Sequence, residues 1–191
     1  MPIADRRERE RAERRRLIVE TARGLAEAEG WDAVTTRRLS TAIEYSQPVL
    51  YKHFAGMEQI ADAVALDGFA ELTEALRTAR ADGGLTRVAQ AYLDFARANP
   101  AVYDAMFTRA TALQFAAEDT PPELTASFAE LRHAVATVAA ERDADTLTEV
   151  LWAALHGMVT LGRAGRLRPD FEAERLRLLV AQFANEAAGQ R

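Results

Sequence analysis

Cysteine is absent from this chain of 191 residues, which excludes disulfide bonds, thiolate metal sites and a cysteine nucleophile. Histidine is scarce: there are three residues, and none has a second histidine at a metal-ligating spacing. We find no nucleophile–base pair and no phosphate-binding glycine loop, so an enzyme is the least favoured class. Neither a metal nor another cofactor is expected.

Long apolar runs are also missing. No stretch approaches the ~20 apolar residues that span a bilayer, and the basic N-terminus lacks the apolar segment of a secretory signal. We therefore expect a cytoplasmic protein without a membrane partner. The apolar fraction of 49% and the charged fraction of 28% are ordinary for a globular chain.

The charge of the chain is unevenly distributed. The net charge is −5, but residues 1–56 contain eleven basic against nine acidic residues, a net charge of +2. Residues 57–191 contain thirteen basic against twenty acidic residues, a net charge of −7. This distribution places any DNA-facing surface at the N-terminal end.

Apolar residues recur at helical spacing almost everywhere, and no run alternates as a half-buried strand would, so the fold is expected to be all-α. A first helix carries Ile18 and Ala22 and ends at Gly30. Thr35 can cap a second helix that continues to Glu44, and Ser46 can cap a third with Pro48 in its first turn. The arm that precedes the first helix is compatible with either a helix or disorder.

The pattern continues as a long amphipathic helix over residues 57–80, interrupted at Asp82-Gly83-Gly84. The remaining helices are expected over residues 85–98, 101–115, 122–140, 145–163 and 171–187.

Three helices with a short turn before the third indicate a helix-turn-helix, whose last helix can enter the major groove of DNA. Residues 35–54, TTRRLSTAIEYSQPVLYKHF, resemble the DNA-binding region of the TetR/AcrR family, above all in the Leu-Tyr-x-His-Phe ending. Residues 151–161, LWAALHGMVTL, are similar to the Trp-x-x-x-His-Gly signature of one effector-domain branch of that family. The resemblance covers both halves of the chain.

The resemblance implies an N-terminal three-helix DNA-binding domain, residues 1–56, with residues 1–12 as the arm. A long helix would join it to an effector-binding and dimerisation domain, residues 57–191. The expected function is a sequence-specific regulator, a repressor that a small molecule releases from a palindromic operator. Two residues depart from the family pattern. Glu44 replaces the usual glycine of the turn, where a positive φ would cost a glutamate about 1 kcal/mol. Met57 replaces a common lysine.

Side chains near the second and third helices are the candidates for DNA contact. Gln47 and Val49 begin the third helix, where they can reach base edges, whereas Tyr51, Lys52 and His53 can donate to phosphates. Local packing is the alternative for Tyr51 and His53, and Leu50 and Phe54 are expected in the core. The full candidate set is Thr35, Thr36, Arg37, Ser46, Gln47, Pro48, Val49, Tyr51, Lys52 and His53.

Aromatic, sulfur and imidazole side chains of the second domain are the candidates for an apolar or amphipathic effector. They are Phe95, Tyr103, Met106, Phe107, Phe128, Trp152 and His156. Simple core packing is the alternative, and for His156 it is at least as well supported.

The last two helices carry apolar stripes that, by resemblance, form a homodimer interface. The stripes consist of Leu147, Leu151, Leu155 and Met158 on one helix and Leu176, Leu179, Val180 and Phe183 on the other. A competing hypothesis for the whole chain is a helical protein that sequesters a small molecule without reading DNA, because of Glu44, Met57 and the weak basicity of residues 1–56.

Overall fold

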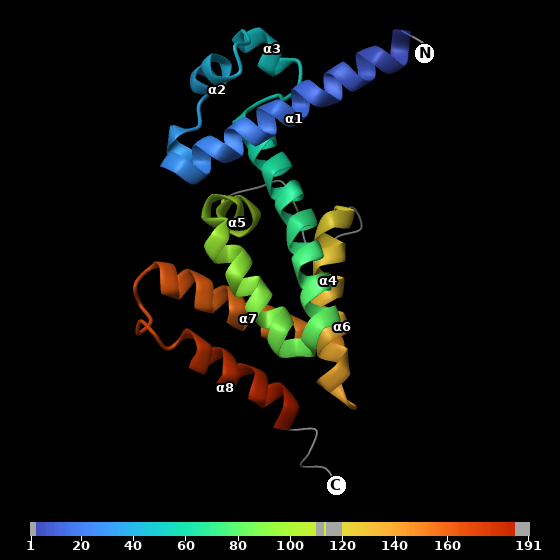
Figure 1. The fold of residues 1–191 in the computed structure, drawn as a ribbon, viewed down its shortest axis with the longest axis vertical. Coiled ribbons are helices and arrows are strands. Elements are labelled where there is room, and N and C mark those ends of the chain that lie inside the picture. The colour runs from blue at the N-terminus through green and yellow to red at the C-terminus, as the bar shows by residue number, and fades with distance from the viewer. Residues whose placement is uncertain (1–2, 110–112, 114–119, 186–191) are drawn as a thin grey trace. The chain divides into compact units, whose positions relative to one another are not determined.

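The computed structural model describes residues 3–109, 113 and 120–185. Within these residues the chain is helical and contains no strand, as expected (Figure 1). The helices are α1 (Ile3–Glu29), α2 (Thr36–Ala42), α3 (Gln47–Tyr51), α4 (Met57–Ala98), α5 (Pro100–Phe107), α6 (Pro122–Ala139), α7 (Ala144–Arg163) and α8 (Glu172–Asn185), with a short 3₁₀ turn at Trp31–Ala33.

The chain divides into two compact units, each made of two separate segments of sequence. The first comprises Met1–Gly68 and Asn99–Pro121, and the second comprises Phe69–Ala98 and Pro122–Arg191. Helix α5 therefore belongs to the same unit as α1, α2 and α3. The expected functional boundary after residue 56 does not coincide with this division and stays a prediction.

Several expected helix ends differ from the observed ones. The described part of the arm is helical, since α1 begins at Ile3. Helix α2 ends at Ala42 rather than Glu44. Helix α5 ends at Phe107 rather than near residue 115, because Thr108 and Arg109 leave the helix in a turn; most of residues 110–119 lies outside the described residues.

The break expected at the two glycines is observed inside α4. Gly83 and Gly84 have non-helical backbone angles, and Gly84 has φ 66°, which costs glycine little because it has no Cβ. Helix α4 is thus two arms, residues 57–82 and 85–98. The first arm begins in the first unit and ends in the second.

The core of the first unit is formed where the apolar face of α1 meets α2 and α5. Ile18 and Ala22 of α1 are fully buried, together with Leu39 of α2 and Tyr103 of α5. Figure 1 shows α2 and α3 together on one side of α1.

Polar contacts fasten α5 to the C-terminal half of α1. The Glu27 carboxylate accepts hydrogen bonds from the first amides of α5, those of Ala101 and Val102, at 3.1 and 3.0 Å. The Trp31 indole donates to the Ala101 carbonyl at 2.8 Å. A helix leaves its first amides without partners inside the helix, so Glu27 caps α5 from 74 residues away in the sequence.

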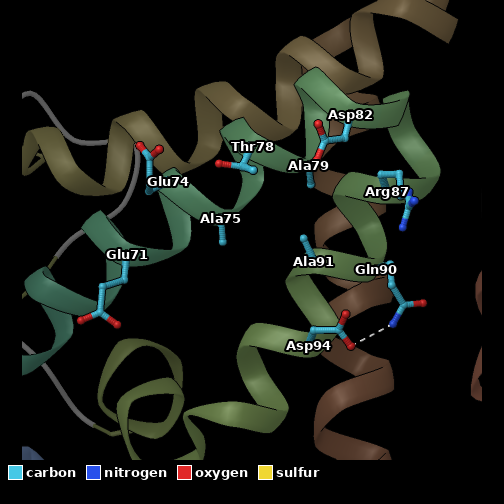
Figure 2. A pocket seen from close by; sticks show the side chains of 10 residues that line it. All are labelled: Glu71, Glu74, Ala75, Thr78, Ala79, Asp82, Arg87, Gln90, Ala91 and Asp94. Carbon is cyan, nitrogen blue, oxygen red and sulfur yellow. Dashed lines mark hydrogen bonds between the residues drawn. The ribbon is translucent and has the colours of Figure 1, made fainter.

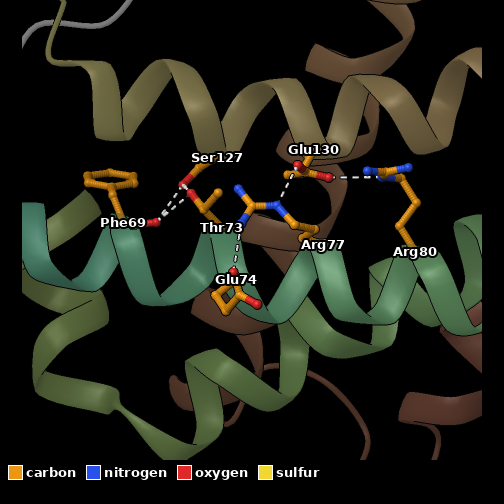
Figure 3. A network of polar contacts seen from close by, with 7 residues as sticks. All are labelled: Phe69, Thr73, Glu74, Arg77, Arg80, Ser127 and Glu130. Carbon is orange, nitrogen blue, oxygen red and sulfur yellow. Dashed lines mark hydrogen bonds and ion pairs between the residues drawn. The ribbon is translucent and has the colours of Figure 1, made fainter.

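In the second unit, α6 packs against α7 and α8 and is joined to α4 by a polar network (Figure 3). The hydroxyls of Thr73 and Ser127 lie 2.7 Å apart, and each is within hydrogen-bond distance of the Phe69 carbonyl, at 2.7 and 2.8 Å. One turn further on, the Glu130 carboxylate accepts from Arg77 at 3.3 Å and from Arg80 at 2.9 Å.

Candidate nucleic-acid interface and effector residues

The turn between α2 and α3 sets the geometry of the helix-turn-helix. Two hydrogen bonds end α2, from the Tyr45 amide to the Ser40 carbonyl at 3.0 Å and from the Glu44 amide to the Thr41 carbonyl at 3.4 Å. This pairing is the Schellman motif, which needs a left-handed residue between its two ends. Glu44 occupies that position with φ 57°. The positive φ suspected at this glutamate is therefore confirmed.

Thr35 caps α2 as the sequence predicts, whereas Ser46 occupies the position before α3 without capping it through its side chain. Thr35 precedes α2, and its side chain accepts a hydrogen bond from the Arg38 amide at 3.2 Å. Ser46 precedes α3 without a side-chain cap bond, and Pro48 lies in the first turn. Arg38 pairs with Glu29 at the end of α1 at 2.5 Å, which links α2 to α1. Arg38 is therefore a positioning residue that was not among the candidates.

Helix α3 has one buried and one exposed face. Leu50 and Phe54 are each 2% exposed, so their expected core role is confirmed. Tyr51 is 53% exposed despite its large ring, and Lys52 is exposed beside it. An exposed aromatic hydroxyl next to an amino group on a short helix suits phosphate contact.

The other candidates for DNA contact are also accessible. Thr35, Arg37, Ser46, Gln47 and Pro48 are exposed, and Thr36, Val49 and His53 are half-buried. Neither Arg37 nor Lys52 forms an ion pair with an acid among the residues that the structure describes. Their charges thus remain available to an anionic partner.

His53 lies at the C-terminal end of α3, close to α1. Burial lowers the pKa of its imidazole, and the positive charges of Arg11, Arg14, Arg15 and Lys52 lower it further. Both effects favour the neutral form of the ring. Its Nδ1 is buried without a hydrogen-bond partner in the described chain.

Arg15 ties α1 to the end of α3, a contact that the sequence reasoning missed. Its guanidinium donates to the His53 carbonyl at 3.1 Å and lies 4.1 Å from the centre of the Phe54 ring. The signal was available, because Arg15 precedes the buried Ile18 by three residues and so shares its helix face.

The effector candidates are distributed over both units. Tyr103 and Met106 are buried in the first unit, with Phe107 half-buried, while Phe95 is buried in the second unit with Phe128, Trp152 and His156 half-buried. The Trp152 indole donates to the hydroxyl of the buried Tyr92 at 3.1 Å. Burial lowers the pKa of His156, and the nearby Arg163 adds to this effect. Their roles toward a ligand stay predictions.

A groove of about 550 Å³ opens between the two arms of α4 (Figure 2). Alanines from both arms, Ala75, Ala79 and Ala91, form its walls, and polar and acidic side chains surround them. None of the seven effector candidates lines this groove. Among the described residues there is no group of three or more acidic or histidine side chains suited to a metal ion.

No helix within the described ranges combines the length and apolar character needed to cross a bilayer.

Comparison with known proteins agrees with this architecture. Residues 18–64 match the family model of bacterial regulatory proteins of the tetR family, and residues 85–183 match the tetracyclin repressor-like C-terminal domain. These matches do not test the Trp-x-x-x-His-Gly branch, which stays a prediction.

Individual relatives are HTH-type transcriptional regulators or share the fold. The uncharacterized HTH-type transcriptional regulator Rv0681 of Mycobacterium tuberculosis is 31% identical over 79% of this chain and 71% of its own length. The regulator YobS of Bacillus subtilis is 31% identical over 47% of this chain, and the match spans about half (49%) of that relative. A structure from Rhodococcus sp. RHA1, described as a protein with unknown function, has a TM-score of 0.71 at 24% identity, covering 90% of this chain and 94% of that one.

Members of this family are DNA-binding transcriptional regulators and not enzymes. The matched models, the relatives and the helix-turn-helix geometry together show that this chain belongs to the tetR family of bacterial regulatory proteins.

Proposed function

We propose that this protein is a cytoplasmic repressor that binds a specific DNA operator through α3 and is released by a small molecule. The observation that carries the proposal is the exposed face of α3, where Tyr51 and Lys52 lie opposite the buried Leu50 and Phe54. A helix with this division can enter the major groove while its other face stays in the core.

The side chains divide into two roles. Gln47 and Val49, in the first turn of α3, would read base edges: a glutamine amide can pair with adenine, and a valine can contact a thymine methyl. Tyr51, Lys52 and His53 would contact phosphates, as would the N-terminal turn of α2 with Thr35, Thr36 and Arg37. Ser46 and Pro48 would lie at the edge of the same surface.

A homodimer through α7 and α8 would give the operator its symmetry. Of the apolar stripes named from the sequence, Leu151, Leu155, Leu176 and Phe183 are buried within the protomer, so they are not available to a second copy. Instead, Val150, Leu161 and Leu178 are exposed on these two helices, at 53%, 44% and 48%. A two-fold dimer requires half-sites about 34 Å, or a multiple of that, apart.

Gly157 offers a test of the dimer. It lies between Val150 and Leu161 on α7, and a Cβ added there meets no atom of the protomer within 4 Å. The substitution Gly157→Trp should therefore leave the protomer folded but prevent close packing of a second copy on α7. Light scattering should show a monomer. Gly24→Trp on α1, where the added Cβ also meets nothing, is the matched control and should stay dimeric.

Release by an apolar or amphipathic effector would follow from a preference of the ligand for the protein state that binds DNA poorly. The ligand can shift the equilibrium only by that preference. The aromatic and imidazole candidates described above supply apolar contact and a few polar groups, as such sites require.

Selection of duplexes from a random DNA library by the purified protein tests the central proposal. We expect enrichment of a palindrome, and we expect alanine at both Tyr51 and Lys52 to weaken binding and reduce its dependence on salt. Binding without enrichment, or no binding, would refute the repressor and favour a protein that only sequesters a small molecule.

A further inference from the structure

The N-terminal half of α1 projects beyond the core of its unit. Every residue from Asp5 to Leu17 is exposed, and the buried part of the helix begins at Ile18. Figure 1 shows this half of α1 continuing past α3. The fold of the unit does not need these three turns for its core, so their sequence is free to serve another purpose.

Arginines gather on one face of this exposed segment. Arg7, Arg11, Arg14 and Arg15 precede the buried Ile18 by eleven, seven, four and three residues, the spacings that put side chains on one face of a helix. Glu10 borders this face and pairs with Arg6 at 3.6 Å. The face that α1 buries further along the chain thus continues as a row of positive charge.

This face points at the C-terminal end of α3. Arg15 bonds the His53 carbonyl and stacks on Phe54, and the charges of Arg11 and Arg14 are near enough to lower the pKa of His53. The arginines therefore adjoin Lys52, which is itself a candidate for phosphate contact. Together they extend the positive surface of the helix-turn-helix along α1.

The arginines on the other faces of the segment differ in their contacts. Arg6 pairs with Glu10 at 3.6 Å, Arg16 pairs with Glu20 at 3.5 Å, and Arg9 donates to the Asp5 carbonyl at 3.2 Å. In contrast, Arg7, Arg11 and Arg14 have no ion pair with any acid of the described chain. No acid among the described residues neutralises their charges.

We propose that Arg7, Arg11 and Arg14, the arginine stripe, form a second DNA-binding element that contacts backbone phosphates of the operator beside the groove occupied by α3. This inference rests on the proposed function. The stripe spans about 10 Å of helix, comparable with about three base-pair steps of one strand. Guanidinium groups match phosphate oxygens in a bidentate arrangement. The stripe would add affinity without sequence preference.

The test compares two triple variants on the operator selected by the wild-type protein. One is R7A/R11A/R14A, which removes the stripe, and the other is R6A/R9A/R16A, which removes the same charge from the other faces. Both replace arginine by alanine on an exposed helix, so both should keep α1 folded; circular dichroism checks this. The measurement is the dissociation constant across a range of salt concentrations.

We expect the stripe variant to bind at least about tenfold more weakly near 0.1 M salt. The slope of log K against log salt should fall by about 0.9 for each lost phosphate contact, or by up to about 5 for the arginines of both protomers of a dimer. The control variant should keep most of the wild-type affinity and slope. Equal losses in both variants would overturn the inference, because charge alone and not its placement would then matter.

The outcomes also separate the inference from the proposed function. If the wild-type protein selects a palindrome but the stripe variant binds it as tightly and with the same salt slope, the stripe is not a DNA-binding element and the repressor proposal stands. If the wild-type protein selects no operator, both fall.

Discussion

Replacing Gly68 by alanine isolates the effect of close packing on the stability of the first unit. Gly68 lies in α4 within that unit. A Cβ built on it would lie 2.4 Å from Cγ1 of Val102 and 2.8 Å from Sδ of Met106. Both side chains belong to α5 and are buried, at 0% and 2% exposure, so neither can move into solvent.

Two effects of opposite sign determine the magnitude. Alanine in place of glycine inside a helix ordinarily adds about 0.5 to 1 kcal/mol of stability. Forcing a methyl group into a packed core costs about 1 to 3 kcal/mol, and the branched Val102 has few alternative rotamers. Overpacking therefore outweighs propensity, and we expect Gly68→Ala to lower the free energy of unfolding by up to about 2 kcal/mol.

Gly24→Ala in α1 is the matched control, because an added Cβ there meets no atom within 4 Å. It should stabilise the protein by about 0.5 to 1 kcal/mol. Thermal unfolding at one fixed protein concentration should separate the two variants by about 2 to 10 °C in Tm. If the Tm of Gly68→Ala equals or exceeds that of Gly24→Ala, then α4 and α5 do not pack as closely at Gly68 as the structure places them.

A double variant sharpens the test. Val102→Ala removes the closest atom, so adding Gly68→Ala to it should cost less than adding it to the wild type. If Gly68→Ala lowers the free energy of unfolding by the same amount in both backgrounds, Val102 is not the source of the clash.

Three further predictions concern the backbone angle of Glu44, the ion pairs of Glu130 and the indole hydrogen bond of Trp31. Glu44→Gly should raise the free energy of unfolding by about 1 kcal/mol in urea titrations, and more than Glu44→Ala does, because only glycine adopts its positive φ without strain. Burial opposes ionisation of Glu130, but hydrogen bonds from two arginines outweigh it and hold its pKa below the ordinary 4.5. The stabilisation is therefore complete above that ordinary value and is lost as pH falls. Wild type and Glu130→Gln should differ by about 1 kcal/mol at pH 7 and converge as pH falls below the ordinary value. Trp31→Phe should cost about 1 to 3 kcal/mol, since it leaves the Ala101 carbonyl without its indole donor; an unchanged Tm would contradict that bond.

Local sequence signals predicted local structure well. Thr35 as a cap, the break at Gly83 and Gly84, and the left-handed backbone at Glu44 each depend on neighbouring residues, which periodicity and turn chemistry capture. Leu50 and Phe54 were assigned to the core because residues four apart share a helix face. The DNA-contact residues rest on the same reasoning together with the family resemblance and stay predictions.

Contacts between distant residues were not predictable in this way. Glu27 caps α5 across 74 residues, and Trp152 bonds Tyr92 across 60; neither partner carries a signal for the other in a single sequence. The apolar stripes of α7 and α8 could not distinguish burial within the protomer from burial against a second copy for a similar reason. Periodicity shows that Leu151 and Leu155 need burial, but not whether this chain or a second copy supplies it.

The capping of α5 by Glu27 has a consequence for chimeras between regulators. A transplant of residues 1–68 alone would carry Glu27 and Trp31 but leave behind the amides and the carbonyl that they bond. A carboxylate and an indole would then face a foreign helix that does not complement them. A functional graft of the first unit should therefore include residues 99–107. These residues follow a stretch of 30 residues that belongs to the second unit. In this protein, the part that can be exchanged consists of two separate segments of sequence that hydrogen bonds hold together, so one continuous segment does not contain it.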